Sequence, residues 1–341
     1  MPSPSHDRVD YLDGWRGVAI GALLLGHFVG PFGVGSRLMN AGRLGVELFF
    51  ALSGTLMGRL LFVKKVPIPS FYRRRVSRIF PALYVFLIGV CIWLSLRERA
   101  VSPPGLLSVL LLYYNYYAAV AHRTLPPEYA QIWSLCIEEH AYIALSLVAV
   151  VARRTGVRPW LPIAGLVIAS WLSAAAYVCF TDWDYYRIFW RTETRLSAVF
   201  VAAGLVCWLD ETPRPWVSGG WWLAVLGIGI SLQAVMVPDI VKYTIGSACL
   251  AVAATHLPVA PDWVRRLLGW SGLAWFGVLS YSIYLWQQPF KELRDVASGP
   301  TCLAGAVVAG ALSFYLLENP VRQWLNKRWG ARPLPRDVTD A

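Results

Sequence analysis

The stretch Gly17-Val-Ala-Ile-Gly-Ala-Leu-Leu-Leu-Gly-His27-Phe-Val29 is apolar throughout except for one imidazole. Such a run is typical of a membrane-spanning helix. An ionisable side chain inside one is energetically costly, so we expect it to have a function. Arg16 lies eleven residues before His27. In an α-helix this spacing leaves the two side chains roughly 20° apart on one face and about 16 Å apart along the axis. We therefore expect a cation near one membrane surface and an imidazole deeper in the bilayer, along one pathway.

The composition indicates a polytopic membrane protein. Of the 341 residues, 57% are hydrophobic and 15% are charged, whereas soluble domains carry about 25% charged residues. Apolar blocks of about 20 residues recur from end to end. No polar segment is long enough to fold separately, so we expect a single transmembrane domain over 1–341, with cytoplasmic tails at 1–14 and 321–341. The 17 Trp and 16 Tyr suit the aromatic belts at membrane interfaces.

The net charge of +11 is explained by topology. Lys and Arg cluster in short loops between the apolar blocks, which is the positive-inside pattern of membrane proteins. The positive charge therefore indicates which loops face the cytoplasm, and no nucleic-acid partner is expected. The six cysteines are scattered without a CxxC pair and predict neither a metal site nor a disulfide framework.

The predicted fold is an all-α membrane bundle of about ten transmembrane helices with both termini in the cytoplasm. The approximate spans are 15–33, 43–62, 79–96, 131–152, 159–179, 195–209, 217–236, 241–257, 269–290 and 299–317. The basic segment from Arg59 to Arg78 is placed inside, as are the groups at Arg153 and Arg265 and the C-terminal tail. Residues 105–121 are also apolar, but counting them as a span would move Arg153 outside. We expect this segment to be re-entrant or interfacial.

The second span opens with Gly45-Val46-Glu47-Leu48-Phe49-Phe50 and continues to Ser53-Gly54. Glu47 lies one residue inside the apolar boundary, so it is either functional or merely interfacial. Ser53 and Gly54 are small, which favours close packing against another helix.

The loop after this span contains Arg75 and Arg78, which are three residues apart and hence neighbours on a helix face. Two guanidinium groups held together at the cytoplasmic start of a helix make a good clamp for phosphates. Topology alone would also make this loop basic, and position does not separate the two explanations.

A pair of carboxylates, Glu138 and Glu139, follows Trp133-Ser134-Leu135 at the start of another span. Adjacent carboxylates entering a membrane helix are hard to explain by packing, so at least one is expected to be functional. Glu138 shares a helix face with Tyr142. Either carboxylate is placed to neutralise the imidazolium or the arginine of the first span.

The polar stretch Thr181-Asp182-Trp183-Asp184-Tyr185-Tyr186 falls on the outer side in this topology. Its acidic and aromatic residues suit a hydroxylated acceptor such as a sugar. An ordinary solvated loop explains them equally well.

Together these blocks resemble the acyltransferase-three family of integral-membrane O-acyltransferases, which includes O-antigen and exopolysaccharide acetylases and macrolide acylases. Each motif is short, and the resemblance is specific because of their order and spacing. The motifs are Tyr11-Leu12-Asp13-Gly14-Trp15-Arg16-Gly17, Arg16 and His27 at their spacing, Gly45 to Gly54, Arg75-x-x-Arg78-Ile-Phe-Pro, Trp133-Ser134-Leu135 with Glu138-Glu139, Ser280-Tyr281-Ser282-Ile283-Tyr284-Leu285-Trp286, and Glu318-Asn319-Pro320.

Two positions depart from the family pattern. Gln287 stands where the family often has His after Tyr-Leu-Trp, so the role of that histidine is either lost or taken by an amide. His140 stands where the family usually has Gln after the Glu pair. Because His140 lies near the span boundary, we expect it to face lipid headgroups.

The resemblance implies a multi-pass protein of the bacterial cytoplasmic (inner) membrane. Its donor would be cytoplasmic acetyl-CoA or another acyl-CoA, and its acceptor a hydroxyl of an extracytoplasmic glycan or small molecule, with no metal. His27 would be the general base or a transient acyl carrier, and Arg16 would bind the donor or stabilise developing charge. Glu138 would complete the catalytic set, while Arg75 and Arg78 would hold coenzyme A phosphates. Supporting positions would be Glu47, Glu139, Ser53 and Trp133.

The main alternative is a transporter or flippase without acyl-transfer chemistry. Ten spans with intramembrane ionisable residues describe those proteins too. They often show two matching halves with paired helix breaks, and this sequence shows no obvious internal repeat.

Overall fold

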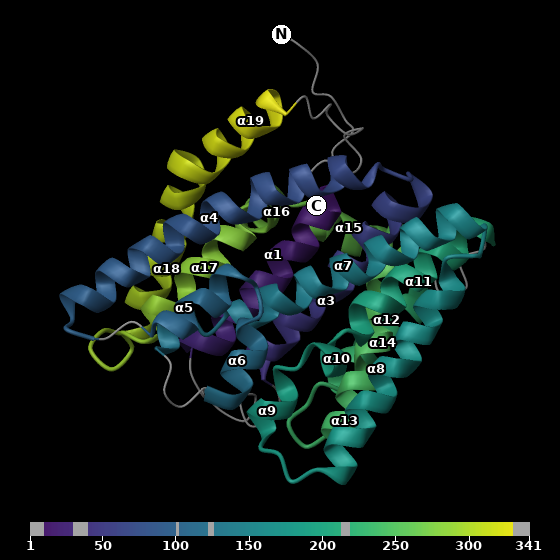
Figure 1. Cartoon of the computed structure of the whole chain (residues 1–341), viewed down its shortest axis with the longest axis horizontal. Coiled ribbons are helices and arrows are strands. Elements are labelled where there is room, and N and C mark those ends of the chain that lie inside the picture. The colour runs from purple at the N-terminus through teal and green to yellow at the C-terminus, as the bar shows by residue number, and fades with distance from the viewer. Residues whose placement is uncertain (1–9, 30–39, 100–101, 122–125, 213–218, 330–341) are drawn as a thin grey trace.

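A computed structural model describes residues 10–29, 40–99, 102–121, 126–212 and 219–329. Within these ranges the chain forms helices and no β-strand, which confirms the all-α prediction. Figure 1 shows α9 (Tyr185–Phe189) and α13 (Asp239–Val241) at the opposite end of the molecule from α15 (Asp262–Leu268) and α16 (Ser271–Val278).

Five helices of the described chain are long and apolar enough to cross a membrane. They are α3 with η2 (Ala41–Gly58, Arg59–Val63), α4 (Ile68–Leu96), η4 with α7 (Pro127–Tyr129, Ile132–Thr155), α8 (Trp160–Phe180), and α18, η7 and α19 in succession (Gly299–Ser313, Phe314–Glu318, Asn319–Arg328). In α3 78% of the apolar window is buried, against 22% in α8. Thus α3 is central, whereas α8 is peripheral and presents apolar side chains outward, as a lipid-facing helix does.

The remaining helices are shorter. They are α1 (Asp10–Leu24), η1 (Leu25–Val29), α5 (Pro103–Leu110), α6 (Tyr114–Ala121), α10 (Thr192–Arg195), α11 (Ser197–Glu211), α12 (Gly219–Ser231), η5 (Lys242–Gly246), α14 (Ser247–Thr255), η6 (Leu257–Val259) and α17 (Ser280–Lys291). The predicted spans 241–257 and 269–290 are each divided between elements, and residues 30–33 of the first span lie outside the described ranges. The ten crossings and the cytoplasmic termini therefore stay predictions.

Residues 105–121 do not form one continuous helix. The short helices α5 and α6 are separated by Leu112, whose backbone is left-handed with φ 56°. A leucine in this region breaks helical geometry. The segment is therefore too interrupted to span a membrane as a single helix, and its depth in the bilayer stays a prediction.

Close backbone contacts set the position of α1 against the end of α15 and against α16. A Cβ added at Gly14 would lie 1.8 Å from the carbonyl oxygen of Leu268, and one added at Gly277 would lie 1.8 Å from that of Asp13. Only glycine permits such an approach, and small residues are the usual means of packing membrane helices closely. This packing holds Arg16 of α1 beside the start of α17.

Several basic segments meet at one end of the bundle. Arg153, near the end of α7, donates to the carbonyl oxygens of Leu61 at 2.7 Å and Val66 at 3.0 Å. Arg73, near the start of α4, donates at 3.3 Å to the carbonyl of Trp329, which follows α19. These contacts bring together segments that the charge pattern assigns to the cytoplasm.

Candidate active site

Two adjoining cavities lie beside α1, α4 and α17. The first, of about 210 Å³, has a polar lining that includes Arg16, Arg78, Ser282, Glu318, Asn319 and Arg322. The second, of about 90 Å³, is lined in part by Phe50, Ser53, Arg75, Ser134, Glu138 and Tyr284. Both include Arg16, Arg78 and Tyr281, so the cavities meet at these three residues.

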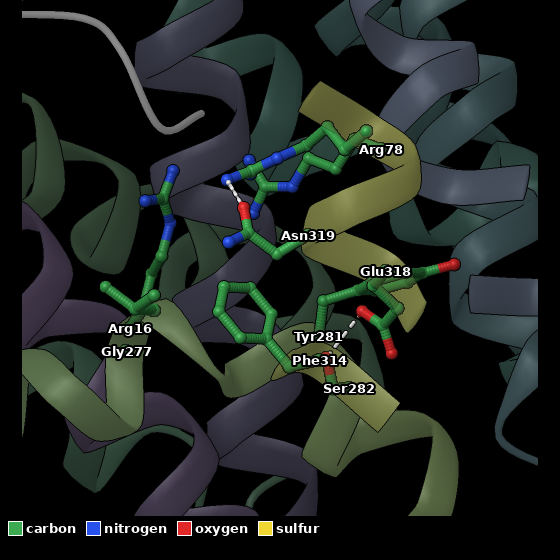
Figure 2. A pocket seen from close by; sticks show the side chains of 10 residues that line it. Arg16, Arg78, Gly277, Tyr281, Ser282, Phe314, Glu318 and Asn319 are labelled. Atoms are coloured by element: carbon green, nitrogen blue, oxygen red, sulfur yellow. Dashed lines mark hydrogen bonds between the residues drawn. The ribbon is translucent and has the colours of Figure 1, made fainter. Parts of the chain in front are cut away.

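Three guanidinium groups face the first cavity, from Arg16, Arg78 and Arg322. Figure 2 shows Arg16 and Arg78 extending toward the space beside Asn319. The Asn319 side-chain oxygen accepts a hydrogen bond of 3.2 Å from Arg322. Sequence reasoning did not select Arg322, although it lies three residues after Asn319 and therefore on the same face of α19.

Arg16 is buried, with 7% of its surface exposed, and it forms an ion pair of 2.9 Å with Asp13 one turn earlier. Asp13 thus supplies a counter-charge to Arg16, and Arg16 and Glu138 line the same second cavity. Neutralisation of His27 or Arg16 by Glu138 or Glu139 stays a prediction. An arginine neutralised from behind still offers N–H donors to a ligand in the cavity.

Arg75 and Arg78 both line the second cavity, so the sequence-predicted pair does converge on one space. The Arg75 guanidinium lies 3.8 Å from the centroid of the Tyr142 ring. It also donates to the Met57 sulfur at 3.3 Å. Arg75 is therefore fixed in orientation by an aromatic face and a thioether.

Glu138 is held by two hydroxyl groups, because both Ser53 and Tyr142 donate to its carboxylate. The predicted common face of Glu138 and Tyr142 is confirmed by this contact. Ser53 and Gly54 are both small residues of α3, for which close helix packing is predicted, but their contacts differ. Ser53 bonds Glu138, while Gly54 packs tightly, since a Cβ there would lie 2.2 Å from the carbonyl oxygen of Val199.

Glu47 is buried within the protein, and its place relative to the membrane interface stays a prediction. Only 1% of it is exposed, and it forms an ion pair with Arg195 of α10. The Ser247 hydroxyl donates to its second oxygen at 2.9 Å. Neither Glu47 nor Trp133 lines the two cavities; Trp133 packs edge-on against Phe50, with ring centroids 6.4 Å apart.

The two residues after Glu138 point elsewhere. Glu139 is buried, lines neither cavity, and has one carboxylate oxygen without a hydrogen-bond partner among the described residues. His140 does not face lipid headgroups as expected. Its Nδ1 lies 2.7 Å from the Thr192 hydroxyl and its ring stacks on Tyr116, because α6 and α10 cover this part of α7.

His27 faces the protein interior, not lipid. Its Nδ1 lies 2.6 Å from Oε1 of Gln287, and Arg294 donates to its backbone carbonyl at 2.7 Å. His27 is absent from the lining of both cavities. Tyr284, which does line the second, precedes Gln287 by three residues on α17, an axial rise of about 4.5 Å.

The expectation that Arg16 and His27 share one pathway stays a prediction. Arg16 lines both cavities and His27 lines neither. Between the two residues the regular α-helix ends at Leu24, and Leu25–Val29 form a π turn. A π turn holds more residues than an α turn, so the direction of each following side chain shifts. Such turns occur frequently at functional sites.

Residues 9–316 match the model of a family described as an acyltransferase domain. The chain belongs to the acyltransferase-three family. Among its relatives, the peptidoglycan O-acetyltransferase OatA of Listeria monocytogenes is 24% identical over 94% of this chain and 56% of the relative. The O-acetyltransferase OatA of Staphylococcus aureus is 27% identical over 82% of this chain and 50% of the relative.

BcsY of Komagataeibacter xylinus, to which a membrane-bound transacylase activity is ascribed, is 28% identical over 96% of this chain and 84% of its own length. The chain thus spans about half the length of the O-acetyltransferase relatives named above, which share its acyltransferase domain. No solved structure shows significant similarity to the chain.

Replacing Gly42 with alanine tests whether the position of the His27 ring matters in this acyltransferase-family chain. A Cβ at Gly42 would lie 3.2 Å from Nε2 of His27, closer than such contacts usually are. We expect Gly42→Ala to lower acyl transfer by about ten- to a hundredfold by displacing the ring. Folding should be kept, because the next neighbour outside that ring is Asn40 Oδ1 at 3.5 Å.

The measurement is the rate of label transfer from acetyl-CoA in membranes that contain equal amounts of each variant. Gly21→Ala is the matched control, because nothing lies within 4 Å of a Cβ at that position. A wild-type rate for Gly42→Ala would show that the reaction does not depend on the close approach of the His27 ring to Gly42.

Proposed function

We propose that the protein transfers an acyl group, most simply acetyl, from cytoplasmic acyl-CoA to a hydroxyl of an extracytoplasmic glycan or other hydroxylated acceptor. The observation that carries the proposal is the cavity lined by Arg16, Arg78 and Arg322. Guanidinium groups bind phosphate oxygens through paired charge-assisted hydrogen bonds, and coenzyme A carries several phosphates. The cavity thus suits the phosphate-bearing end of the donor.

The second cavity extends this path toward α17. It adjoins the arginine-lined cavity at Arg16 and Arg78 and is lined partly by apolar side chains, among them Phe50. Tyr284 and Ser134 lie in its wall, with their hydroxyl oxygens 2.5 Å apart. This arrangement fits a pantetheine arm that carries the thioester toward the level of Gln287 and His27.

The reaction would proceed at His27. In the direct route, one imidazole nitrogen takes the proton of the acceptor hydroxyl while that oxygen attacks the thioester carbonyl. The carbon–sulfur bond then breaks, and the coenzyme A thiolate receives the proton from the imidazolium. In the alternative route a ring nitrogen of His27 attacks the thioester carbonyl, and the coenzyme A thiolate leaves as the carbon–sulfur bond breaks. The acceptor hydroxyl then attacks the acyl-imidazole and displaces His27, and its proton passes to the thiolate. Arg16 would hold the donor or stabilise negative charge on the carbonyl oxygen.

The acceptor is proposed to approach from the end of the molecule that carries α9. There Trp183 stacks on Tyr177 with ring centroids 4.9 Å apart, and the Arg43 guanidinium lies 5.0 Å from the Tyr185 ring. Aromatic faces of this kind suit sugar rings. Since two relatives are named as O-acetyltransferases, one of them of peptidoglycan, a peptidoglycan fragment is the first acceptor to test.

The decisive experiment supplies labelled acetyl-CoA to membranes that contain the protein, with peptidoglycan fragments on the outer side. Covalent label in the glycan is the expected result. Uptake of solute without covalent label would instead favour the transporter or flippase. Mass spectrometry of surface glycans with and without the protein would identify the acceptor by one acyl mass difference.

Removing an arginine from the donor cavity should raise the KM for acyl-CoA. For Arg78→Ala and Arg322→Ala we expect an increase of about ten- to a hundredfold, because hydrogen bonds to charged groups contribute about 1.5–3 kcal/mol each. The KM for the acceptor should stay within about twofold. Arg265→Ala is the control, since this arginine pairs with Asp262 on α15 and lines neither cavity. Equal effects on both substrates would count against a donor site here.

A further inference from the structure

A chain of hydrogen bonds runs from His27 along the end of α17 to Glu292. The His27 Nδ1 lies 2.6 Å from Gln287 Oε1, and the Gln287 amide nitrogen donates to Gln288 Oε1 at 3.4 Å. The Gln288 amide nitrogen in turn donates to the Glu292 carboxylate at 3.0 Å. Both glutamines are buried, with 0% and 4% of their surfaces exposed, so water does not compete for these contacts.

The chemistry of the chain fixes its direction. An ionised carboxylate can only accept, whereas each glutamine amide donates through nitrogen and accepts through oxygen. Glu292 therefore accepts a hydrogen bond from the amide nitrogen of Gln288. The amide oxygen of Gln288 is then free to accept from the amide nitrogen of Gln287. The oxygen of Gln287 is then left for the imidazole, and it can only accept a hydrogen bond from the N–H at Nδ1.

We propose that Glu292, through Gln288 and Gln287, holds His27 in the tautomer with hydrogen on Nδ1 and a free lone pair on Nε2. The inference rests on the proposed function, in which His27 is the reacting imidazole. The hydrogen bond made by one ring nitrogen decides which form the other takes. Glu292 is thus a positioning residue that acts on His27 through Gln288 and Gln287.

Contacts on either side keep the chain in register. Pro289 lacks an N–H and leaves the carbonyl of Leu285 without its helical donor. The side chain of Gln131 fills this place with a bond of 2.7 Å. At the other end Arg294 anchors the His27 carbonyl at 2.7 Å, and Nε2 faces Gly42.

The state of Glu292 sets the conditions of the test. Burial raises the pKa of the Glu292 carboxyl above its ordinary value, and the adjacent Lys291 ammonium opposes the shift. Glu128 and Arg99, which face it from outside α17, act in opposite senses, Glu128 raising and Arg99 lowering the pKa. Spectra are best recorded at mildly alkaline pH, where the carboxyl is ionised and accepts only.

The experiment is nitrogen NMR of the full-length protein, labelled at histidine nitrogens and embedded in lipid nanodiscs. The sequence holds five histidines, and the signals of His27 are those lost in His27→Gln. For the wild type we expect Nδ1 to appear as an N–H nitrogen and Nε2 as a lone-pair nitrogen. Glu292→Gln should give a mixture of both tautomers, because the new amide can reverse the chain. Glu292→Asp and the exposed-site control Asp295→Asn should keep the wild-type pattern.

Activity supplies an independent readout. Glu292→Gln should lower kcat by roughly two- to tenfold, in proportion to the fraction of His27 that leaves the productive tautomer. The KM for the donor should not change. A wild-type spectrum with hydrogen on Nε2, or a Glu292→Gln spectrum identical to the wild type, would overturn the inference. If the tautomer pattern is as expected but the wild type transfers no acyl group, then the proposed function fails and the positioning chain stands. If His27→Ala still transfers acyl groups, then His27 is not the reacting group, and the tautomer has no catalytic role.

Discussion

Replacement of His27 with alanine is expected to abolish acyl transfer. A positioned base speeds proton transfer by about a hundred- to ten-thousandfold. The rate of acyl transfer should therefore fall by at least that factor and be indistinguishable from background in a membrane assay. The Nδ1 atom of the His27 ring lies 2.6 Å from Oε1 of Gln287, so this contact fixes the ring. Labelled acetyl-CoA with an added glycan acceptor gives the measurement.

A loss of activity has meaning only if the His27→Ala protein is folded. Removing the ring leaves the buried Gln287 oxygen without its partner, which costs about 1–3 kcal/mol. Protein level in membranes and the unfolding temperature should therefore drop modestly. His27→Gln is a useful companion, because an amide at this position can still bond Gln287 while being unable to act as a base. Near-normal transfer in either variant would remove His27 from the mechanism.

Arg195→Met is expected to have the largest effect on stability. Its guanidinium pairs with Glu47, and the two side chains are only 2% and 1% exposed. Phe189 and Tyr243 lie against it, with ring centroids 4.6 Å and 4.8 Å from the guanidinium carbon. Breaking a buried ion pair from one side leaves an uncompensated charge and costs about 3–5 kcal/mol. Thermal unfolding in detergent, followed by size-exclusion chromatography, should show it.

A double variant shows whether the loss of stability comes from the lost ion pair or from the unpaired charge left at Glu47. When both partners become apolar, as in Glu47→Leu with Arg195→Met, much of the stability should return, because replacing a buried pair with apolar groups is often neutral. Arg265→Met, which alters an ion pair whose side chains are 40% and 73% exposed, serves as the control and should behave like the wild type. If Arg195→Met alone is as stable as that control, the Arg195–Glu47 ion pair does not contribute to the stability of the fold.

Much of the site could be predicted because its members are coupled by helix geometry. Arg75 and Arg78 are one turn apart, as are Glu138 and Tyr142, so their convergence follows from a period of about 3.6 residues. Intramembrane charges were also a reliable signal, since burying them is expensive. What the sequence does not show is which distant residue answers each charge. Glu47 pairs with Arg195, 148 positions away, through a contact that only the packing of α3 against its neighbours creates.

The bundle itself shows the same division. An all-helical membrane protein follows from hydropathy, whereas the number of crossings does not, since long apolar runs such as 269–290 fold into separate helices. The sequence does not single out Arg322, because topology alone explains a basic residue after the last apolar run. It does not mark Asp13 as the partner of Arg16 either, because Asp13 precedes the first apolar run.

The π turn at Leu25–Val29 makes the chemistry of the first helix sensitive to length as well as to composition. Such a turn accommodates one residue more than the regular helix around it. A chain shortened by one residue there would close into ordinary α-helix and change the direction in which the imidazole points. Every side chain that now surrounds the ring would still be present, yet the ring would no longer face them. A deletion at Leu25–Val29 is therefore expected to disrupt the contacts of His27 even though no side chain around the ring is changed.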